Sequence, residues 1–241
     1  GLQGFFTNRA LILVDGRQIF DSTFGGTLLG SWPFQLEDIE RIEVIRGPGG
    51  VTWGANTTNG VINIITKDPI EQLGVTATGM GGTQGTQKEH LGYGYADSKL
   101  RMRVSAEYEG SNGFQHGDNW GIPLNDHFGD WRSNIHAIYE ASDNDTLTIS
   151  GGNSIVHDNN PLPVVVGYHN RTDSGSQASF LMGKWQHQIA NDNYFTFTGY
   201  VNDFGVRPGV RSIDYRYQQL ASQFSHTFSP ADNHTLTWGI D

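Results

Sequence analysis

The sequence predicts a mainly β protein, in which a small α/β region precedes part of a transmembrane antiparallel β-barrel. Three observations predict this fold class. After residue 72, apolar and polar residues alternate with the period of two, which is typical of strands with two different faces. Short polar turns alternate with long loops along the same part. The preceding part lacks this pattern and consists of short apolar runs joined by glycine-rich connections.

The N-terminal part predicts a small α/β unit. In order, we expect a strand over 9–14, a tight turn at 15–16, a loop over 21–33, one or two helical turns over 36–41, and strands over 42–45 and 61–66. Asp15-Gly16 favours the turn, because both residue types tolerate tight backbone geometry. Leu36 and Ile39 are three residues apart and would share one helix face.

The part after residue 72 predicts about nine long strands. From Leu100 to Tyr108, apolar residues at even positions alternate with Arg101, Arg103, Ser105 and Glu107. The same alternation recurs over 131–139, 146–150, 194–201 and 235–240. Most of these strands approach the ~10 residues that cross a bilayer at a tilt.

The lengths of the connections favour a membrane barrel over a soluble sandwich. Short polar turns are expected at 97–99, 142–145, 190–193 and 230–233, and longer loops near 110–130, 155–175 and 202–213. Short turns at one end and long loops at the other are typical of outer-membrane barrels, whereas a soluble sandwich does not need this alternation. The aromatic residues at strand ends fit an interfacial girdle, although ordinary strand propensity also explains them.

Composition and motifs exclude several functions. The 25 acidic residues outnumber the 15 basic ones, and the net charge of −10 argues against nucleic acid as a partner. There is no cysteine, so disulfides and thiolate sites are excluded. The sequence contains no GxSxG, HExxH or CxxC motif, and the glycines at 49–54 lack the Lys-Ser/Thr of a phosphate-binding loop. We therefore expect no enzyme, no cofactor and no metal site.

The two ends suggest that the sequence is a piece of a longer protein. The first residues, from Gly1 onward, have neither the basic nor the apolar region of a signal peptide, and Asp241 falls within an alternating pattern. Nine strands also leave open edges, whose backbone groups would be unpaired in lipid. We expect the remaining strands to come from further chain.

Four motifs resemble the plug domain of the TonB-dependent outer-membrane receptors. They are LILVDG at 11–16, LEDIERIEVIRGP at 36–48, WGAN at 53–56 and NGVINIITK at 59–67. Their order and spacing are similar to those of the family over about 55 residues, and the strands that follow agree with its barrel. The resemblance implies a 22-stranded barrel filled by a plug. Residues 1–68 would form the C-terminal half of the plug, and 69–241 about the first nine barrel strands.

The resemblance also implies a function and partners. It implies TonB-dependent active import of a scarce ligand across the bacterial outer membrane, with ferric siderophore as the first candidate and cobalamin as the second. The expected partners are TonB, whose binding segment we do not expect within these residues, outer-membrane lipid, and a small-molecule or metal-chelate ligand. A non-transporting receptor or adhesin, a truncated remnant and an independent soluble β-rich binding protein are the alternatives.

The loop before the LEDIERIEV motif is expected at the outward apex of the plug. Its candidate ligand-binding residues are Asp21, Ser22, Thr23, Phe24, Leu28 and Trp32. The aromatic and aliphatic side chains would form an apolar platform, and the others would supply hydrogen bonds. Packing of this loop against the barrel wall is the alternative.

Two further groups of charged or aromatic residues are candidate contacts. Arg46 is expected to pair with carboxylates of the barrel wall, in a network with Glu40, Arg41 and Glu43, because a charge in the lumen needs a partner. The alternative is that these charges are solvated. In the long outer loops, the candidate ligand contacts are Phe114, His116, Trp120, Arg207 and Arg211.

Overall fold

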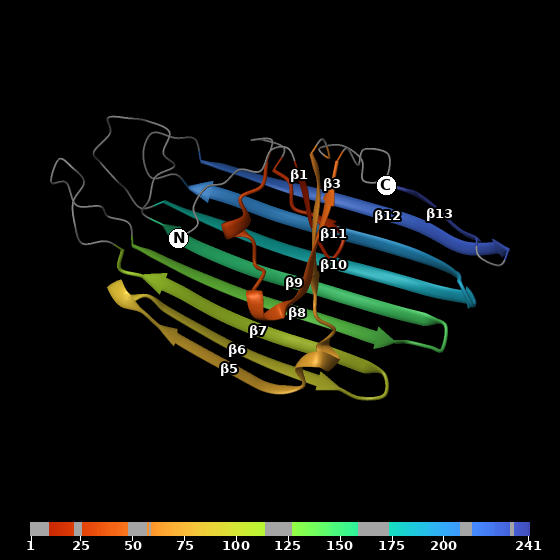
Figure 1. The fold of residues 1–241 in the computed structure, drawn as a ribbon, viewed down its shortest axis with the longest axis horizontal. Helices are drawn as coiled ribbons and strands as arrows, with labels where there is room; N and C mark the ends of the chain where they lie inside the picture. Colours follow the sequence, from red (N-terminus) through yellow and green to blue (C-terminus); the bar gives the residue numbers. More distant parts are fainter. Residues whose placement is uncertain are drawn as a thin grey trace.

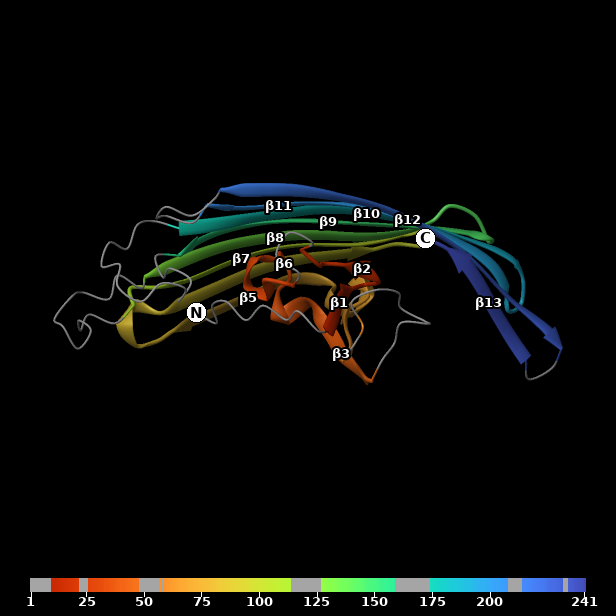
Figure 2. The same cartoon turned by 90° about the horizontal axis from the view of Figure 1, so that it is seen from above.

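The computed structural model contains two β-sheets that pack face to face. It describes residues 10–21, 26–47, 57, 59–113, 127–158, 174–207, 214–231 and 234–241. A four-stranded sheet has the order β2-β1-β4-β3, and a nine-stranded sheet runs from β5 to β13 in sequence order (Figure 1). Seen from above, the large sheet is curved, and the small sheet lies on its concave side (Figure 2). We call the large sheet the wall, and the described residues up to Asp68 the plug region.

The small sheet is built from four short strands. They are β1 (Ala10–Val14), β2 (Arg17–Gln18), β3 (Ile39–Arg46) and β4 (Gly60–Thr66). β1 pairs in parallel with β4, and the other pairs are antiparallel. The predicted tight turn is confirmed, because Asp15 and Gly16 both have positive φ, and the Asp15 carboxylate accepts a 2.9 Å hydrogen bond from the backbone N–H of Thr66. The turn is thereby fixed to the neighbouring strand.

The prediction of one or two helical turns over 36–41 is only partly confirmed. Only Leu36–Asp38 form a single 3₁₀ turn, η2, and Ile39 already belongs to β3. The two residues expected on one face separate: Leu36 is 69% exposed, whereas Ile39 packs against the buried core. The physical reason is that the β-branched residues of 39–45 favour a strand, which the ladder to β4 stabilises.

The remaining described helices are also short. They are the 3₁₀ turns η1 (Leu29–Ser31), η3 (Pro69–Gln72) and η4 (Thr83–Gly85). Among the described residues, no helix has the length and apolarity needed to cross a membrane.

The wall confirms the prediction of nine antiparallel strands. They are β5 (Gly74–Gly81), β6 (Gln87–Ala96), β7 (Leu100–Ser111), β8 (Phe128–Glu140), β9 (Asp145–Asp158), β10 (Ser174–Ala190), β11 (Asn193–Arg207), β12 (Tyr215–Ala231) and β13 (His234–Ile240). The short turns after β6, β8 and β10 lie at one end of the sheet (Figure 1). The loop expected over 202–213 begins later than predicted, since β11 continues to Arg207, which pairs with Gly175 of β10.

The two faces of the wall have the polarity of a membrane barrel. The apolar set of β7 and its neighbours points away from the plug region, so that Val104, Ile135 and Leu181 are exposed. The polar set of β7, Arg103, Ser105 and Glu107, is buried beneath the plug region. Large apolar side chains face outward over many adjacent strands. Exposure of so wide an apolar surface to water is unfavourable, so this face needs a lipid environment.

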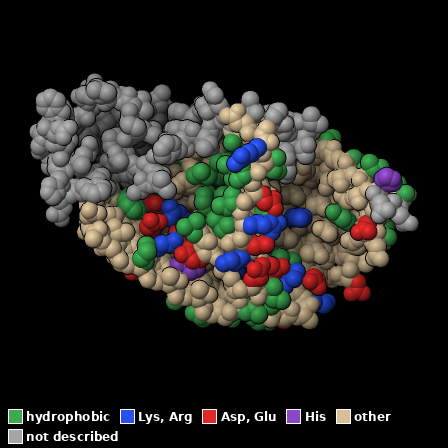
Figure 3. Space-filling view, viewed as in Figure 1, with side chains coloured by type: hydrophobic (Ala, Val, Ile, Leu, Met, Phe, Trp, Pro, Cys, Tyr) green, Lys and Arg blue, Asp and Glu red, His purple; other side chains and the backbone are tan. Residues whose placement is uncertain are grey.

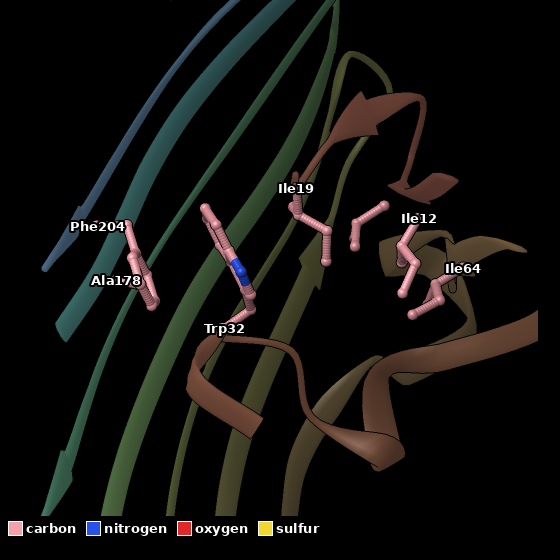
Figure 4. Close-up of a cluster of buried hydrophobic side chains, with 7 residues drawn as sticks. Ile12, Ile19, Trp32, Ile64, Ala178 and Phe204 are labelled. Carbon is pink, nitrogen blue, oxygen red and sulfur yellow. The ribbon is translucent and has the colours of Figure 1, made fainter. Parts of the chain in front are cut away.

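The core lies between the two sheets. Ile12, Ile19 and Ile64 of the plug region meet Trp32, which reaches Ala178 and Phe204 of the wall (Figure 4). A second small cluster, made of Leu11, Leu13 and Val61, lies within the small sheet. The plug region therefore packs on the wall through one face of β1 and β4 and through the segment around Trp32.

Candidate functional site

The candidate site is the interface between the plug region and the wall. Acidic and basic side chains are intermixed across the middle of the plug-bearing face (Figure 3). The contacts fall into an aromatic anchor, a pair of serine contacts, a buried ion pair and a charge cluster.

The aromatic anchor joins β2 and the end of the η1 turn to the wall. The ring of Trp32 stacks on Phe204 of β11, with centroids 5.7 Å apart and planes at 16°. The guanidinium of Arg17 lies 3.7 Å above the ring of Phe180 and 5.2 Å from that of Trp32. Cation–π contacts of this kind are strongest where water is excluded, and Arg17 is 2% exposed.

The buried Arg17 also has a polar partner in the wall. Its Nη1 donates a 2.6 Å hydrogen bond to Oδ1 of Asn202, whose Nδ2 in turn donates to the carbonyl of Gln18 at 2.8 Å. Burial lowers the pKa of Arg17 to about 9, and the nearby Asp15 opposes this shift. The guanidinium is therefore still charged near neutral pH, so its hydrogen bond and its ring contacts are charge-assisted.

Two serine contacts hold the η1 turn against β9 and β10. The hydroxyl of Ser176 donates to the hydroxyl of Ser31 at 2.7 Å, and the hydroxyl of Ser154 donates to the Ser31 carbonyl. Such hydroxyl contacts are modest in net free energy, at about 1 kcal/mol each, and they exchange readily with water once the surfaces separate.

A buried ion pair fixes the start of β3. Oδ1 of Asp38 lies 3.4 Å from Nε of Arg103, and Oδ2 accepts a 2.7 Å hydrogen bond from Ser105. Nη1 of Arg103 also donates to the Lys67 carbonyl at 3.1 Å and to Oε1 of Gln72 at 2.7 Å. This one arginine of the wall thus joins the η2 turn, the end of β4 and the η3 turn.

Beside this pair lies a charge cluster that contains members from both sheets. Nζ of Lys88 on β6 is 3.1 Å from Oε1 of Glu37 and 3.2 Å from Oε2 of Glu107. Nη1 of Arg132 on β8 is 3.2 Å from Oε1 of Glu107. Burial alone would raise the pKa of Glu37, but its own backbone N–H, the neighbouring Glu107 and the hydrogen bond from Lys88 outweigh burial and leave that pKa below its usual range. Glu37 is therefore ionised and attracted to the wall near neutral pH.

Three residues of the predicted ligand-binding loop lie within the described residues. Asp21 is buried, and its carboxylate accepts a 2.7 Å hydrogen bond from Tyr215 of β12. Leu28 packs against the core, and Trp32 is covered by Phe204 and Arg17. These positions agree with the alternative of packing against the wall, and ligand contact stays a prediction. Ser22, Thr23 and Phe24 lie outside the described residues.

The predicted plug–barrel network is present only as a local cluster. Nη1 of Arg41 lies 2.6 Å from Glu40, and Nε lies 2.9 Å from Glu43, which also accepts from Asn63 within the small sheet. Arg46 is exposed at the end of β3. The pairs found for Arg41 and Glu43 thus lie within the small sheet, and contacts with a barrel wall stay a prediction.

The outer-loop predictions fall mostly outside what the structure describes. Phe114, His116, Trp120 and Arg211 lie in segments that are not described, as does the whole WGAN motif. Arg207 ends β11, and only its backbone is described.

Sequence reasoning missed the residues that carry most of the interface. The alternation assigned Arg103 and Glu107 to the polar face of a strand, and no motif singled out Arg17 or Asn202. A signal was available for two of them: Arg103 and Glu107 occupy the polar set of a predicted membrane strand, and charges on that face need partners inside the barrel. The partners themselves come from distant parts of the chain, so the alternation could not name them.

The arrangement defines a class of protein. A lipid-facing sheet whose polar concave side holds a small folded unit, through separable polar contacts and an aromatic anchor, is the wall and plug of an outer-membrane barrel. The comparisons with known proteins agree. Residues 1–61 match the family model described as TonB-dependent Receptor Plug Domain. The N-terminal part of the chain thus carries a TonB-dependent receptor plug domain, and the wall that follows has the fold of part of an outer-membrane receptor barrel.

Two curated relatives and one solved structure illustrate the likeness. The chain is 28% identical over 238 residues to the Vitamin B12 transporter BtuB of Vibrio vulnificus (strain CMCP6), covering 92% of this chain and 38% of that protein. It is 42% identical over 76 residues to the Iron-regulated outer membrane virulence protein of Vibrio cholerae (strain ATCC 39541), covering 30% of this chain and 12% of that protein.

The solved structure extends the likeness over the described fold. The ferric yersiniabactin uptake receptor FyuA from Yersinia pestis has a TM-score of 0.72 at 14% identity, covering 99% of this chain and 40% of that chain. The chain thus spans about two fifths of the length of proteins that it matches over nearly all of its own length.

Proposed function

We propose that the protein containing this chain imports a scarce ligand across the outer membrane by TonB-dependent active transport. The observation that carries the proposal is that the plug region is held on the polar face of a lipid-facing wall by contacts that can separate without breaking a covalent bond. The ligand would bind from outside to the plug apex and outer loops. TonB would then pull the plug, since the outer membrane has no nucleotide supply of its own.

Ferric siderophore is the first ligand class that we propose. The relative from Vibrio cholerae that is 42% identical over 76 residues is described as iron-regulated, and the similar solved structure is that of a ferric yersiniabactin uptake receptor. Both are properties of those proteins, and they support the proposal by family membership.

Cobalamin is the second ligand class, and one specific observation favours it. The relative that matches over 92% of this chain is described as a vitamin B12 transporter. That match includes the wall strands, whereas the match to the iron-regulated relative covers only 30% of the chain.

We further propose that residues 1–68 belong to the plug and 69–241 to the barrel. In the structure, the small sheet ends with β4 at Thr66, and the wall begins with β5 at Gly74, with the η3 turn between them. Within this division, Asp21, Leu28 and Trp32 would line the plug apex, together with Ser22, Thr23 and Phe24. The outer-loop residues Phe114, His116, Trp120, Arg207 and Arg211 are proposed as further contacts.

Uptake measurements test the function and separate the ligand classes. We would delete the gene from its native host and measure uptake of radiolabelled iron in siderophore complexes and of radiolabelled cobalamin. The proposal predicts that one of the two is lost, that the intact gene restores it, and that it requires a functional TonB. Surface binding without TonB-dependent accumulation would instead establish the alternative of a non-transporting receptor.

A further inference from the structure

A buried histidine without hydrogen bonds lies beneath the plug region. His90 of β6 has a side chain that is 1% exposed, and neither of its ring nitrogens has a hydrogen-bond partner. Its Nε2 lies above Gly92, 3.4 Å from where a Cβ would stand at that glycine. Burying a polar ring without partners costs free energy, and such groups in native structures usually have a function or an unseen ligand.

Two carboxylates converge with the imidazole of His90. Its Nδ1 lies 4.0 Å from Oε2 of Glu107 on β7. Glu37 of the η2 turn completes the group: one ligand atom from each of Glu37, His90 and Glu107 lies within 4.8 Å of the other two. Oε2 of Glu107 also has no hydrogen bond, although Lys88 is within ion-pair distance. One nitrogen and two carboxylate oxygens therefore face a common point.

Acidic side chains outnumber basic ones around this point. The carboxyl groups of Glu37, Glu107, Glu109 and Asp130 share the two cations Lys88 and Arg132. A divalent cation at this point would supply further positive charge to these carboxyl groups.

We propose that Glu37, His90 and Glu107 bind a divalent transition-metal ion and that Zn²⁺ suits the site best. An imidazole with carboxylates and no thiolate is a donor set that Zn²⁺ accepts, whereas Ca²⁺ and Mg²⁺ prefer oxygen alone. Zinc bonds of about 2.0–2.2 Å require the three donors to move closer together. The flexible stem of Lys88 allows its ammonium to withdraw from between the two carboxylates, so that Lys88 competes with the metal.

The consequence of this site is a removable clamp between plug and wall. Glu37 belongs to the plug region, whereas His90 and Glu107 belong to neighbouring wall strands that pair at these residues. A metal ion ligated by all three would hold the two parts together until the plug moves. The inference is independent of the imported ligand, because it concerns only residues of this interface.

Zinc binding to the purified intact receptor in detergent tests the proposal. After chelator treatment, equilibrium dialysis against Zn²⁺ alone, followed by metal analysis, gives stoichiometry and affinity. We expect His90→Ala and Glu107→Gln each to weaken one site by about tenfold or more, the scale on which even supporting residues matter. Lys88→Met removes the competing ammonium and is expected to tighten the same site. His234→Ala, which changes an exposed histidine of β13, is the matched control and should leave binding unchanged.

A second readout identifies the clamp itself. Zn²⁺ should slow proteolysis of the plug in the wild type and lose this effect in Glu37→Gln. Heat-dependent migration of each variant on gels verifies that its barrel is assembled. Absence of a stoichiometric site in the wild type, or unchanged affinity in assembled His90→Ala, would overturn the proposal. Neither result concerns ligand uptake, so the proposed import function is tested separately by the uptake measurements.

Discussion

Asp38 and Arg103 form a buried ion pair that joins the plug region to the wall. Oδ1 of Asp38 is 3.4 Å from Nε of Arg103, and their side chains are only 3% and 4% exposed. The pair lies at the start of β3, beside the hydroxyl of Ser105. Since a buried charge without its partner is unfavourable, this pair makes the position of the plug sensitive to a single side chain.

Asp38→Ala should therefore loosen the plug. Arg103 keeps its contacts with the Lys67 carbonyl and Gln72, so we expect a loss of about 1–3 kcal/mol in plug docking. Plug proteolysis in increasing denaturant measures this change. Glu40→Ala, which removes a carboxylate from an exposed ion pair, is the control and should cost less than about 0.5 kcal/mol. Equal effects of the two substitutions would contradict the role of the buried pair.

Trp32→Ala should have a larger effect than either of these changes. It removes the stack on Phe204 and one of the two rings beside Arg17, and it leaves a cavity in the core. Truncation of a buried tryptophan costs about 3–5 kcal/mol. The same proteolysis assay checks this, and a double-mutant cycle with Phe204→Leu should give a coupling of about 0.5–1.5 kcal/mol. Additive effects would show that the stacking contributes nothing specific.

Gly94→Ala should disturb the passage from plug to barrel. A Cβ at Gly94 would lie 2.0 Å from the Gln72 carbonyl oxygen, so the backbone after η3 must shift. We expect a cost of about 1–3 kcal/mol, measured as a lower denaturant midpoint. Gly183→Ala is the matched control, since nothing lies within 4 Å of a Cβ there. Equal denaturant midpoints for the two variants would contradict the close approach of the Gln72 carbonyl to Gly94.

Leu181→Lys should impair assembly in the membrane. Leu181 is 56% exposed on the outward face near the middle of β10, where a charge would meet lipid at a cost of about 2–4 kcal/mol. Gln186→Lys places the same charge on the inward face of the same strand and should assemble normally. The yield of heat-modifiable barrel in outer membranes compares them. Normal assembly of Leu181→Lys would mean that this face does not contact lipid.

Much of the fold could be predicted because the wall has a simple physical pattern. Its alternating residues face either lipid or the interior, so residues such as Val104 and Arg103 reveal their faces from sequence alone. The turn at Asp15-Gly16 was likewise predictable from residue type. The helical turns predicted over 36–41 are limited to Leu36–Asp38. Leu36 and Ile39 have helical spacing, but the strand ladder to β4, a long-range contact, places Ile39 in β3.

The interface was less predictable because its partners are far apart in sequence. Arg17 meets Asn202, and Asp21 meets Tyr215, only because the small sheet packs against β11 and β12. By contrast, Arg41, Glu40 and Glu43 are near neighbours in sequence and pair locally. The charges at 40–46 were expected to reach the barrel wall, but the pairs described for Arg41 are local. The contacts that hold the plug region depend on tertiary structure.

The central claim is that the plug region must move relative to the wall for transport. The hydroxyls of Ser31 and Ser176 are 2.7 Å apart across the interface, and the chain contains no cysteine. The double variant Ser31→Cys, Ser176→Cys therefore places two thiols side by side across the interface, and we expect oxidation to join them in a disulfide. We predict that the oxidised receptor still binds its ligand but does not import it, and that reduction restores uptake. Undiminished uptake with the disulfide fully formed would contradict the account.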